Sequence, residues 1–329
     1  MQTLKINFID FYPGFYPEDN FILDLLKPRF SIELSEHPDY LIYSDYGHKH
    51  LKYDCIKIYY TGENLVPDFN LCDYASSGLF IDFEDRHLRL PLFGLIASYK
   101  KIANKQFDPA QALNRKFCCF VYSNQGNAHP IRNKFFQELS KYKTVDAGGR
   151  AFNNVGGPVR DKLGFLTGYK FTIAIENSGV NGYVSEKIVD PMSVNSIPVY
   201  WGSKYIGRDF NSESLVIIKD DSDTAIREAI EQIKFLDTHD EEYLNMLSTP
   251  WLKEEQKIDY EALYAGFLSH IFEQPYAHAW RRATRGFNMR RTEQLFAVFN
   301  AANNPPAEDT SMKDLCKLFC KKIIKKIKL

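Results

Sequence analysis

Short apolar runs alternate with amphipathic stretches along the first two thirds of the chain. Residues 4–11, 40–45 and 55–64 have the pattern of strands, and residues 20–30 have helical spacing. A second series predicts strands at 117–124, 169–177, 196–202 and 214–219, with helices at 129–142, 183–195 and 224–236. Strands that alternate with helices indicate parallel sheets built from βαβ units.

The polar stretch 100–116 lies between the two series and suggests an interdomain connection. We therefore predict two consecutive doubly wound α/β modules, followed by a helical region from about residue 240. Ligands of open α/β sheets bind beyond the C-terminal ends of the strands. The loops where function is expected are 10–18, 45–50, 60–66, 123–131 and 177–185.

Composition narrows the class of protein. The chain has 329 residues, 44% hydrophobic and 25% charged, as in soluble globular proteins. A net charge of −1 argues against a general nucleic-acid binder, and no apolar run is as long as a membrane span. The N-terminal residues lack the pattern of a secretory signal, so a cytoplasmic protein is expected. Its six cysteines show no zinc-ligand spacing and are expected to be free thiols.

Two cations fall where a helix disfavours them. Lys187 follows Glu186 in the first turn of the helix expected at 183–195, and Arg132 takes a similar place in the helix at 129–142. Each alone reads most simply as a solvated side chain. Together they point to a shared anion such as a diphosphate, because helix N-termini and guanidinium groups bind phosphate well. The absence of a GxGxxG fingerprint and a P-loop lowers the case for dinucleotide or ATP binding.

Glu63 stands just beyond a strand, in the segment YYTGEN. A capped turn with Gly62 and Asn64 is one explanation of this position. The other is a carboxylate that acts as general base at the mouth of a cleft.

The segment DDSD at 220–223 resembles a metal-binding DxD, but Ser222 or Asp223 is favoured as the cap of the following helix. The pair of histidines in HKH at 48–50 lacks a third ligand, so no metal site is predicted.

Residues 312–329 carry seven lysines against one aspartate. Met312, Leu315, Phe319, Ile323 and Ile327 fall on one face of a helix, which predicts a basic amphipathic helix on an anionic membrane surface. A helix that docks on its own protein is the alternative.

The segment 169–203 resembles the donor-binding signature of the α1,3-fucosyltransferases, glycosyltransferase family 10. The matching residues are Tyr169–Phe171, Glu176–Asn177, Tyr183, Glu186–Lys187, Pro198–Val199 and Gly202. The segments 59–64, 69–75, 82–92 and 130–133 are similar to the bacterial branch found in Helicobacter. The departures are Ser185 in place of threonine, Ile175, and Pro191, which should kink or end its helix.

The resemblance implies two facing Rossmann-like domains in the GT-B arrangement. It also implies inverting transfer of L-fucose from GDP-fucose to the 3-OH of N-acetylglucosamine or glucose, in lactose- or N-acetyllactosamine-type glycans. Residues 1–112 would form the acceptor domain, 113–300 the donor domain with trailing helices, and 301–329 the basic tail. The expected products are Lewis-type antigens or 3-fucosyllactose, made at the cytoplasmic face of the membrane.

By the same resemblance, Glu63 is the general base on the acceptor hydroxyl, and Glu186 steadies positive charge on the sugar. The residues expected to bind GDP-fucose are Tyr60, Ser123, Asn124, Arg132, Asn177, Tyr183, Glu186 and Lys187. The acceptor is expected on Phe11, Tyr12, Phe15 and Tyr16. No metal or other cofactor is expected, because protein cations would neutralise the leaving group.

Two other functions remain open at this point. The chain could be a GT-B transferase that uses another nucleotide sugar, or a glycan-binding module that keeps the fold without turnover. Heptad repeats are not evident before the tail, so the sequence does not support a dimer.

Overall fold

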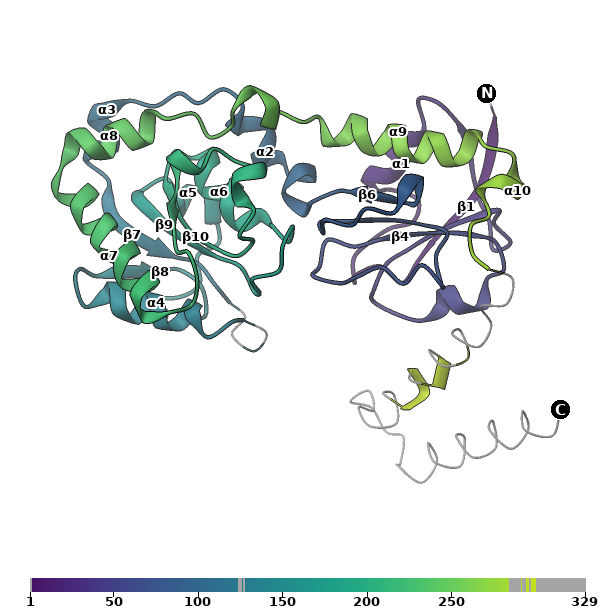
Figure 1. Cartoon of the computed structure of the whole chain (residues 1–329), viewed down its shortest axis with the longest axis horizontal. Coiled ribbons are helices and arrows are strands. Elements are labelled where there is room, and N and C mark those ends of the chain that lie inside the picture. The colour runs from purple at the N-terminus through teal and green to yellow at the C-terminus, as the bar shows by residue number, and fades with distance from the viewer. Residues whose placement is uncertain are drawn as a thin grey trace.

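The computed structural model describes residues 2–123, 126, 128–283, 291, 294, 295 and 297–299, and forms two α/β domains (Figure 1). The first domain contains a six-stranded sheet of order β2-β1-β3-β4-β5-β6, in which every neighbouring pair is parallel. Its strands are β1 (Thr3–Ile9), β2 (Ser31–Leu34), β3 (Tyr40–Tyr43), β4 (Ile56–Tyr60), β5 (Tyr74–Ser77) and β6 (His87–Arg89). The parallel pairing agrees with the βαβ units predicted from the alternating pattern.

The second domain contains a five-stranded parallel sheet of order β11-β10-β9-β7-β8. Its strands are β7 (Lys116–Phe120), β8 (Val145–Ala147), β9 (Tyr169–Ile175), β10 (Ile197–Trp201) and β11 (Val216–Ile217). All seven residues of β9 are buried, which is typical of a central strand covered by helices on both faces.

The described part of the chain contains helices in both domains. They are α1 (Phe21–Leu26), α2 (Ala97–Ile102), α3 (Pro109–Leu113), α4 (Ile131–Ser140), α5 (Lys162–Leu166), α6 (Glu186–Ser193), α7 (Asp223–Thr238), α8 (Asp240–Ser248), α9 (Tyr260–Glu273) and α10 (Tyr276–Ala279). Within the described part of the chain, none of them is long and apolar enough to cross a bilayer.

The chain passes between the domains twice. After β6 it enters α2, which packs against α6 of the second domain, and after α8 it returns so that α9 packs against α1 of the first (Figure 1). On that return the Tyr264 ring lies 6.2 Å from the ring of Tyr60 and joins the first domain's core. This differs from the expectation that the trailing helices all belong to the second domain. Residues 100–116, expected to be a polar connection, also contain part of α2 and all of α3.

Polar contacts hold the two domains together. Arg89, at the end of β6, donates two hydrogen bonds to Asp209 of the second domain, at 2.7 and 2.8 Å. Gly182 has a φ of +93°, and a Cβ there would lie 2.6 Å from the carbonyl oxygen of Gly78. Only glycine fits a position that combines this backbone conformation with such a close approach.

Helix α6 begins and ends as its sequence dictates. Ser185 is its N-cap and accepts from the Lys187 backbone N–H. Pro191 lies in its last turn and lacks the N–H that would continue the helical ladder. The helix ends at Ser193, and Asn195 follows with a φ of +55° in a C-terminal cap. Pro191 therefore lies inside the helix, which continues for two residues beyond it and ends at the cap formed around Asn195.

Candidate active site

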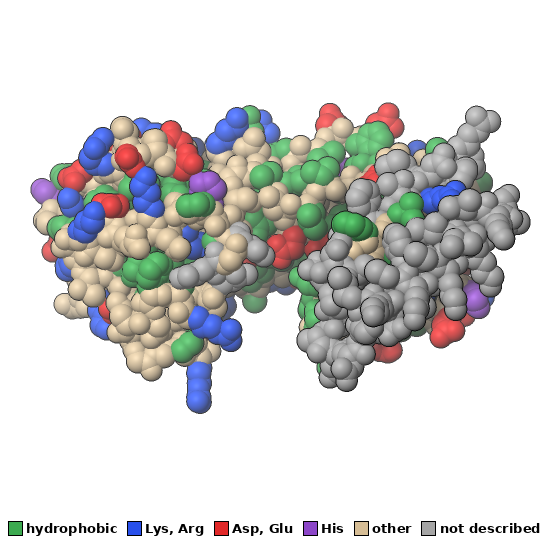
Figure 2. Space-filling model, turned by 90° about the horizontal axis from the view of Figure 1, so that it is seen from below, with side chains coloured by type: hydrophobic (Ala, Val, Ile, Leu, Met, Phe, Trp, Pro, Cys, Tyr) green, Lys and Arg blue, Asp and Glu red, His purple; other side chains and the backbone are tan. Residues whose placement is uncertain are grey.

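The ends of the strands of both domains meet at the domain junction. Asn64, which follows β4, donates a hydrogen bond of 2.7 Å to the Ser178 hydroxyl, which follows β9. Figure 2 shows acidic side chains gathered in the hollow between the two domains. This is where open α/β sheets place their ligands.

A buried carboxylate organises the second domain's side of this junction. Glu176, directly after β9, is fully buried and accepts hydrogen bonds from the Ser185 backbone N–H at 2.7 Å and from the Ser185 hydroxyl. The Lys187 ammonium lies 3.2 Å from the Glu176 carboxylate and donates to the Ser185 hydroxyl at 2.9 Å. Glu176, Ser185 and Lys187 are called the α6 cluster below. The cluster explains Lys187 in a first turn: a buried anion pairs with it.

Neighbouring charges shift the pKa values of Lys187 and Glu186. Burial alone lowers the pKa of Lys187, but Glu176 and Glu186 outweigh burial and hold that pKa above its ordinary value. Burial opposes ionisation of Glu186, yet Lys187 and Lys162 keep its pKa below the ordinary value. Glu186 is therefore an anion at the start of α6, where the helix favours negative charge.

Arg132 is 1% exposed and lies in the first turn of α4. Its guanidinium donates to the carbonyl of Ile175 at 3.0 Å and to the side-chain oxygen of Asn177 at 2.6 Å, and lies 4.1 Å from the centre of the Tyr122 ring. The solvated-cation alternative is therefore wrong for Arg132. Its contacts fix the orientation of Asn177 beside the end of β9.

Glu63 lies at the first domain's side of the junction. Its backbone N–H donates to the Thr61 hydroxyl at 3.0 Å, and that hydroxyl donates to Asp45 at 3.0 Å. The side chain is exposed at the rim, but the surrounding protein displaces enough water to raise its pKa. Asp45 raises that pKa further, while Lys187 opposes the rise, so Glu63 lies within electrostatic reach of the α6 cluster.

The other residues predicted to bind the donor differ in how far they are buried. Tyr183 is 4% exposed, and burial and the charge of Glu176 raise its pKa. Ser123 is exposed after β7, and Asn124 lies outside the described residues. Tyr60 is 8% exposed in the first domain's core, against Phe21. The Tyr60 ring packs in the core, since Tyr60 is the last residue of a fully buried strand, and its binding of the donor stays a prediction.

The predicted acceptor loop divides into partly buried and exposed aromatic residues. The rings of Phe11 and Phe15 stack with their centres 3.9 Å apart and pack on the core. Tyr12 and Tyr16 are 48% and 66% exposed. Phe11 and Phe15 therefore support the loop, and Tyr12 and Tyr16 are its exposed rings.

The two motifs with possible metal ligands have structural partners. Ser222 caps α7 by accepting from the Ala225 N–H at 3.1 Å, as favoured from the sequence, and Asp223 pairs with Lys134. His50 donates its backbone N–H to Asp10 at 2.8 Å.

The cysteines in the described part of the chain are free and buried, as predicted: Cys55, Cys72, Cys118 and Cys119.

Sequence reasoning gave no individual role to Glu176, Asp45 or Tyr46, although Glu176 belongs to the matched signature and loop 45–50 contains Asp45 and Tyr46. A usable signal existed for two of them: Glu176 directly follows the apolar strand YKFTIAI, and Asp45 follows YLIY. A carboxylate at the C-terminal end of a buried parallel strand lies at the ligand-binding edge of its sheet.

Comparison with known proteins agrees with this geometry. Residues 6–96 match the alpha-(1,3)-fucosyltransferase FucT N-terminal domain, and residues 112–265 match the C-terminal domain of glycosyltransferase family 10 (fucosyltransferase). An alpha-(1,3)-fucosyltransferase FucT of Helicobacter pylori is 36% identical over 263 residues, 68% of this chain and 54% of that protein. The chain thus spans about half the length of that relative.

Solved structures extend the likeness to the whole fold. A crystal structure of an alpha1,3-fucosyltransferase with GDP is 30% identical with a TM-score of 0.70, over 84% of this chain and 92% of that one. A crystal structure of an alpha1,3-fucosyltransferase with GDP-fucose gives 30% identity and a TM-score of 0.69, over 84% and 93% of the two chains. These matches confirm the predicted GT-B-type architecture. The chain belongs to glycosyltransferase family 10, the fucosyltransferases.

Proposed function

We propose that this protein is an inverting α1,3-fucosyltransferase that moves L-fucose from GDP-fucose to the 3-OH of N-acetylglucosamine or glucose in lactose- or N-acetyllactosamine-type glycans. One observation carries the proposal: Glu63 of the first domain is near enough to Lys187 of the α6 cluster for that cation to lower its pKa, at a junction where Asn64 donates a 2.7 Å hydrogen bond to Ser178. A carboxylate with a raised pKa and a fixed cation therefore stand on opposite sides of one site.

In the proposed reaction, the Glu63 carboxylate removes the proton of the acceptor 3-OH. The acceptor oxygen forms a bond to C1 of fucose while the bond from C1 to the diphosphate oxygen breaks, and the electron pair leaves with GDP. A raised pKa makes Glu63 a stronger base once it is ionised. The positive charges of Lys187 and Arg132 stabilise the negative charge that grows on the leaving diphosphate. The main role of Arg132 is to position Asn177, whose side-chain oxygen accepts a hydrogen bond from its guanidinium.

The choice of GDP-fucose rests on relatives. Solved alpha1,3-fucosyltransferases hold GDP or GDP-fucose, and the segment that carries the donor signature here, 169–203, contains Asn177 and the whole α6 cluster. The acceptor class and the products, Lewis-type antigens or 3-fucosyllactose, belong to the proposal as well.

Incubation with GDP-fucose and a panel of lactose, N-acetyllactosamine and the isomer with the 3-OH already substituted tests the function. NMR of the product should show an α1,3 linkage on the first two sugars and no product from the third. In parallel, GDP should raise the melting temperature while UDP and ADP should not, because only a ligand that binds the folded state stabilises it. Stabilisation by UDP alone would favour a transferase of another nucleotide sugar. Glycan binding without turnover would favour the binding module.

We also propose that the basic segment 312–329 holds the enzyme on the cytoplasmic face of an anionic membrane. This segment lies outside the described residues, and the proposal rests on its lysine face alone. Each lysine near such a surface contributes about 1 kcal/mol, and salt weakens the attraction. Full-length protein should co-sediment with phosphatidylserine vesicles at low salt, and protein truncated after residue 309 should not. Full-length protein that stays in the supernatant would contradict the proposal.

A further inference from the structure

We propose that Tyr12 and Tyr46 form an aromatic acceptor subsite beside Glu63, which binds the sugar ring next to the one that receives fucose. For lactose and N-acetyllactosamine this neighbouring ring is galactose. The proposal rests on the proposed function and adds a residue, Tyr46, that the sequence did not single out.

The sheet places these side chains on one edge. Strands β1, β3 and β4 are neighbours, and Tyr43 pairs in register with Ile9 on one side and Tyr59 on the other. Tyr12 lies three residues after Ile9, and Tyr46 lies three residues after Tyr43. The proposed base, Glu63, lies four residues after Tyr59. Three adjacent loops therefore carry two tyrosines and the base to the same edge.

The two rings are in contact and remain open to solvent. Their centres lie 6.2 Å apart with an angle of 73° between the planes, an edge-to-face pair. Tyr12 is 48% exposed and Tyr46 is 52% exposed. Burial and the charge of Glu63 raise the pKa of the Tyr46 phenol, so the base lies within electrostatic reach of that ring.

A buried staple holds the two loops in place. Asp10 accepts hydrogen bonds from the backbone N–H groups of Lys49 at 3.1 Å and His50 at 2.8 Å, and its carbonyl accepts from the Tyr46 N–H at 2.9 Å. The His50 ring also contacts the Asp10 carboxylate at 2.9 Å, and these two side chains are only 6% and 2% exposed. Asp10 has a φ of +57°, a strained conformation that these contacts stabilise.

The contacts of Asp10 hold the two tyrosine-bearing loops next to each other, which favours a binding role for their exposed rings. Exposed tyrosines on a loose loop would be ordinary, whereas the backbones of the loops that carry Tyr12 and Tyr46 are joined by the buried contacts of Asp10. Aromatic rings of this kind offer a rigid apolar face at small entropic cost, which suits the C–H face of a pyranose. Because Glu63 must meet the 3-OH of the accepting ring, the rings beside it are placed for the adjoining sugar.

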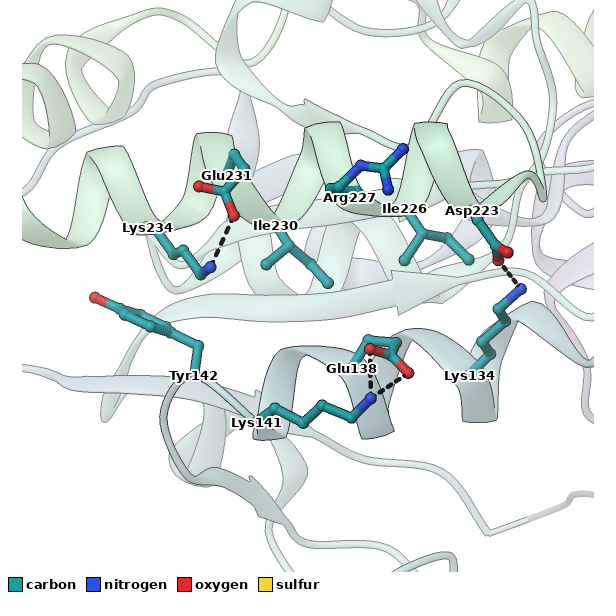
Figure 3. A pocket seen from close by; sticks show the side chains of 10 residues that line it. All are labelled: Lys134, Glu138, Lys141, Tyr142, Asp223, Ile226, Arg227, Ile230, Glu231 and Lys234. Carbon is teal, nitrogen blue, oxygen red and sulfur yellow. Dashed lines mark hydrogen bonds and ion pairs between the residues drawn. The ribbon is translucent and has the colours of Figure 1, made fainter.

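Kinetics with a disaccharide and a monosaccharide acceptor test the subsite. Tyr46→Ala and Tyr12→Ala should each raise the KM for N-acetyllactosamine about fivefold to tenfold, as expected for one lost aromatic contact. The KM for N-acetylglucosamine and for GDP-fucose should stay within about twofold. Tyr46→Phe, which keeps the ring, should behave as the wild type. The matched control is Tyr142→Ala, which removes an exposed tyrosine in the groove between α4 and α7 (Figure 3).

A second measurement separates this proposal from the proposed function. Saturation-transfer NMR with N-acetyllactosamine, run without donor, should show contacts to galactose that Tyr46→Ala weakens and Tyr142→Ala leaves unchanged. Unchanged disaccharide KM and unchanged galactose contacts in Tyr46→Ala would overturn the subsite even if the wild type transfers fucose. Galactose contacts that depend on Tyr46 in a protein without transferase activity would support the subsite and overturn the proposed function instead.

Discussion

The two sides of the domain junction differ in how far their functional side chains are buried. In the second domain Glu176, Lys187 and Arg132 are largely buried and bound to partners inside the protein. In the first domain Glu63 and the ring of Tyr46 are exposed at the rim. Under the proposed function, the second domain would bind one donor and could fix its charges in advance. The first domain would receive the acceptor at an open edge.

The largest expected effect falls on the open side. Glu63→Gln keeps the size of the side chain but removes the base, so transfer should fall about 10²- to 10⁴-fold. GDP binding, measured by isothermal titration calorimetry, should stay within a few-fold because the base acts on the acceptor. Initial rates at saturating GDP-fucose measure the loss. Residual transfer near the wild-type rate would remove Glu63 from the mechanism.

The buried side should respond through stability as well as binding. Lys187→Met leaves the Glu176 carboxylate buried without its ion-pair partner, which should cost up to about 3–5 kcal/mol of unfolding free energy. GDP affinity should fall in the same variant. Urea unfolding and calorimetry measure the two effects.

The double variant Lys187→Met/Glu176→Gln separates the two roles of the lysine. Without the buried charge, much of the stability should return, while GDP affinity should stay low. Recovery of GDP binding together with stability would show that Lys187 serves only the fold. The buried charges of the second domain would then not be a prearranged binding site for the nucleotide.

The sequence predicted the central strands better than the edges of the sheets. β9 and β10 lie in buried apolar runs, YKFTIAI and IPVYW, and were predicted within two residues. β2, β5, β6 and β8 were missed, because SIEL, YASS, HLR and VDA are only three or four residues long and carry no clear strand pattern; three of the four, β2, β6 and β8, are edge strands. Edge strands of this kind depend on pairing with a neighbour.

The candidate site was predicted in part for a similar reason. Arg132 and Lys187 stood out because a cation in a first turn breaks a local rule. Glu176 breaks no local rule, and its importance comes from Lys187 and Ser185 reaching it from another element. Tyr46 likewise gains its meaning from Tyr12 across a loop contact that sequence spacing does not reveal.

A smaller effect concerns the pH dependence of the proposed base. Glu63 must be ionised to take a proton, so kcat/KM should fall as pH drops through its raised pKa. After burial, Asp45 is the largest cause of that rise. Asp45→Asn should therefore move the acid limb of the pH profile to lower pH. Asp24→Asn on α1 is the control and should leave the limb in place; a limb that stays unmoved in Asp45→Asn would assign it to another group.

The smallest expected effect is that of metal removal, for which we predict no change in rate. The proposed donor side has its own cations, Lys187 and Arg132. The segment DDSD is engaged at the start of α7, where Asp220 accepts from the Ser222 N–H at 2.9 Å and Asp223 pairs with Lys134. Initial rates in excess EDTA should match those of the untreated enzyme. Asp223→Asn should lower the melting temperature slightly and leave the rate alone. Complete loss of transfer in EDTA, restored by Mn²⁺, would mean that the fixed cations of the second domain do not neutralise the leaving group by themselves, and would make Asp221 and Asp223 candidate ligands.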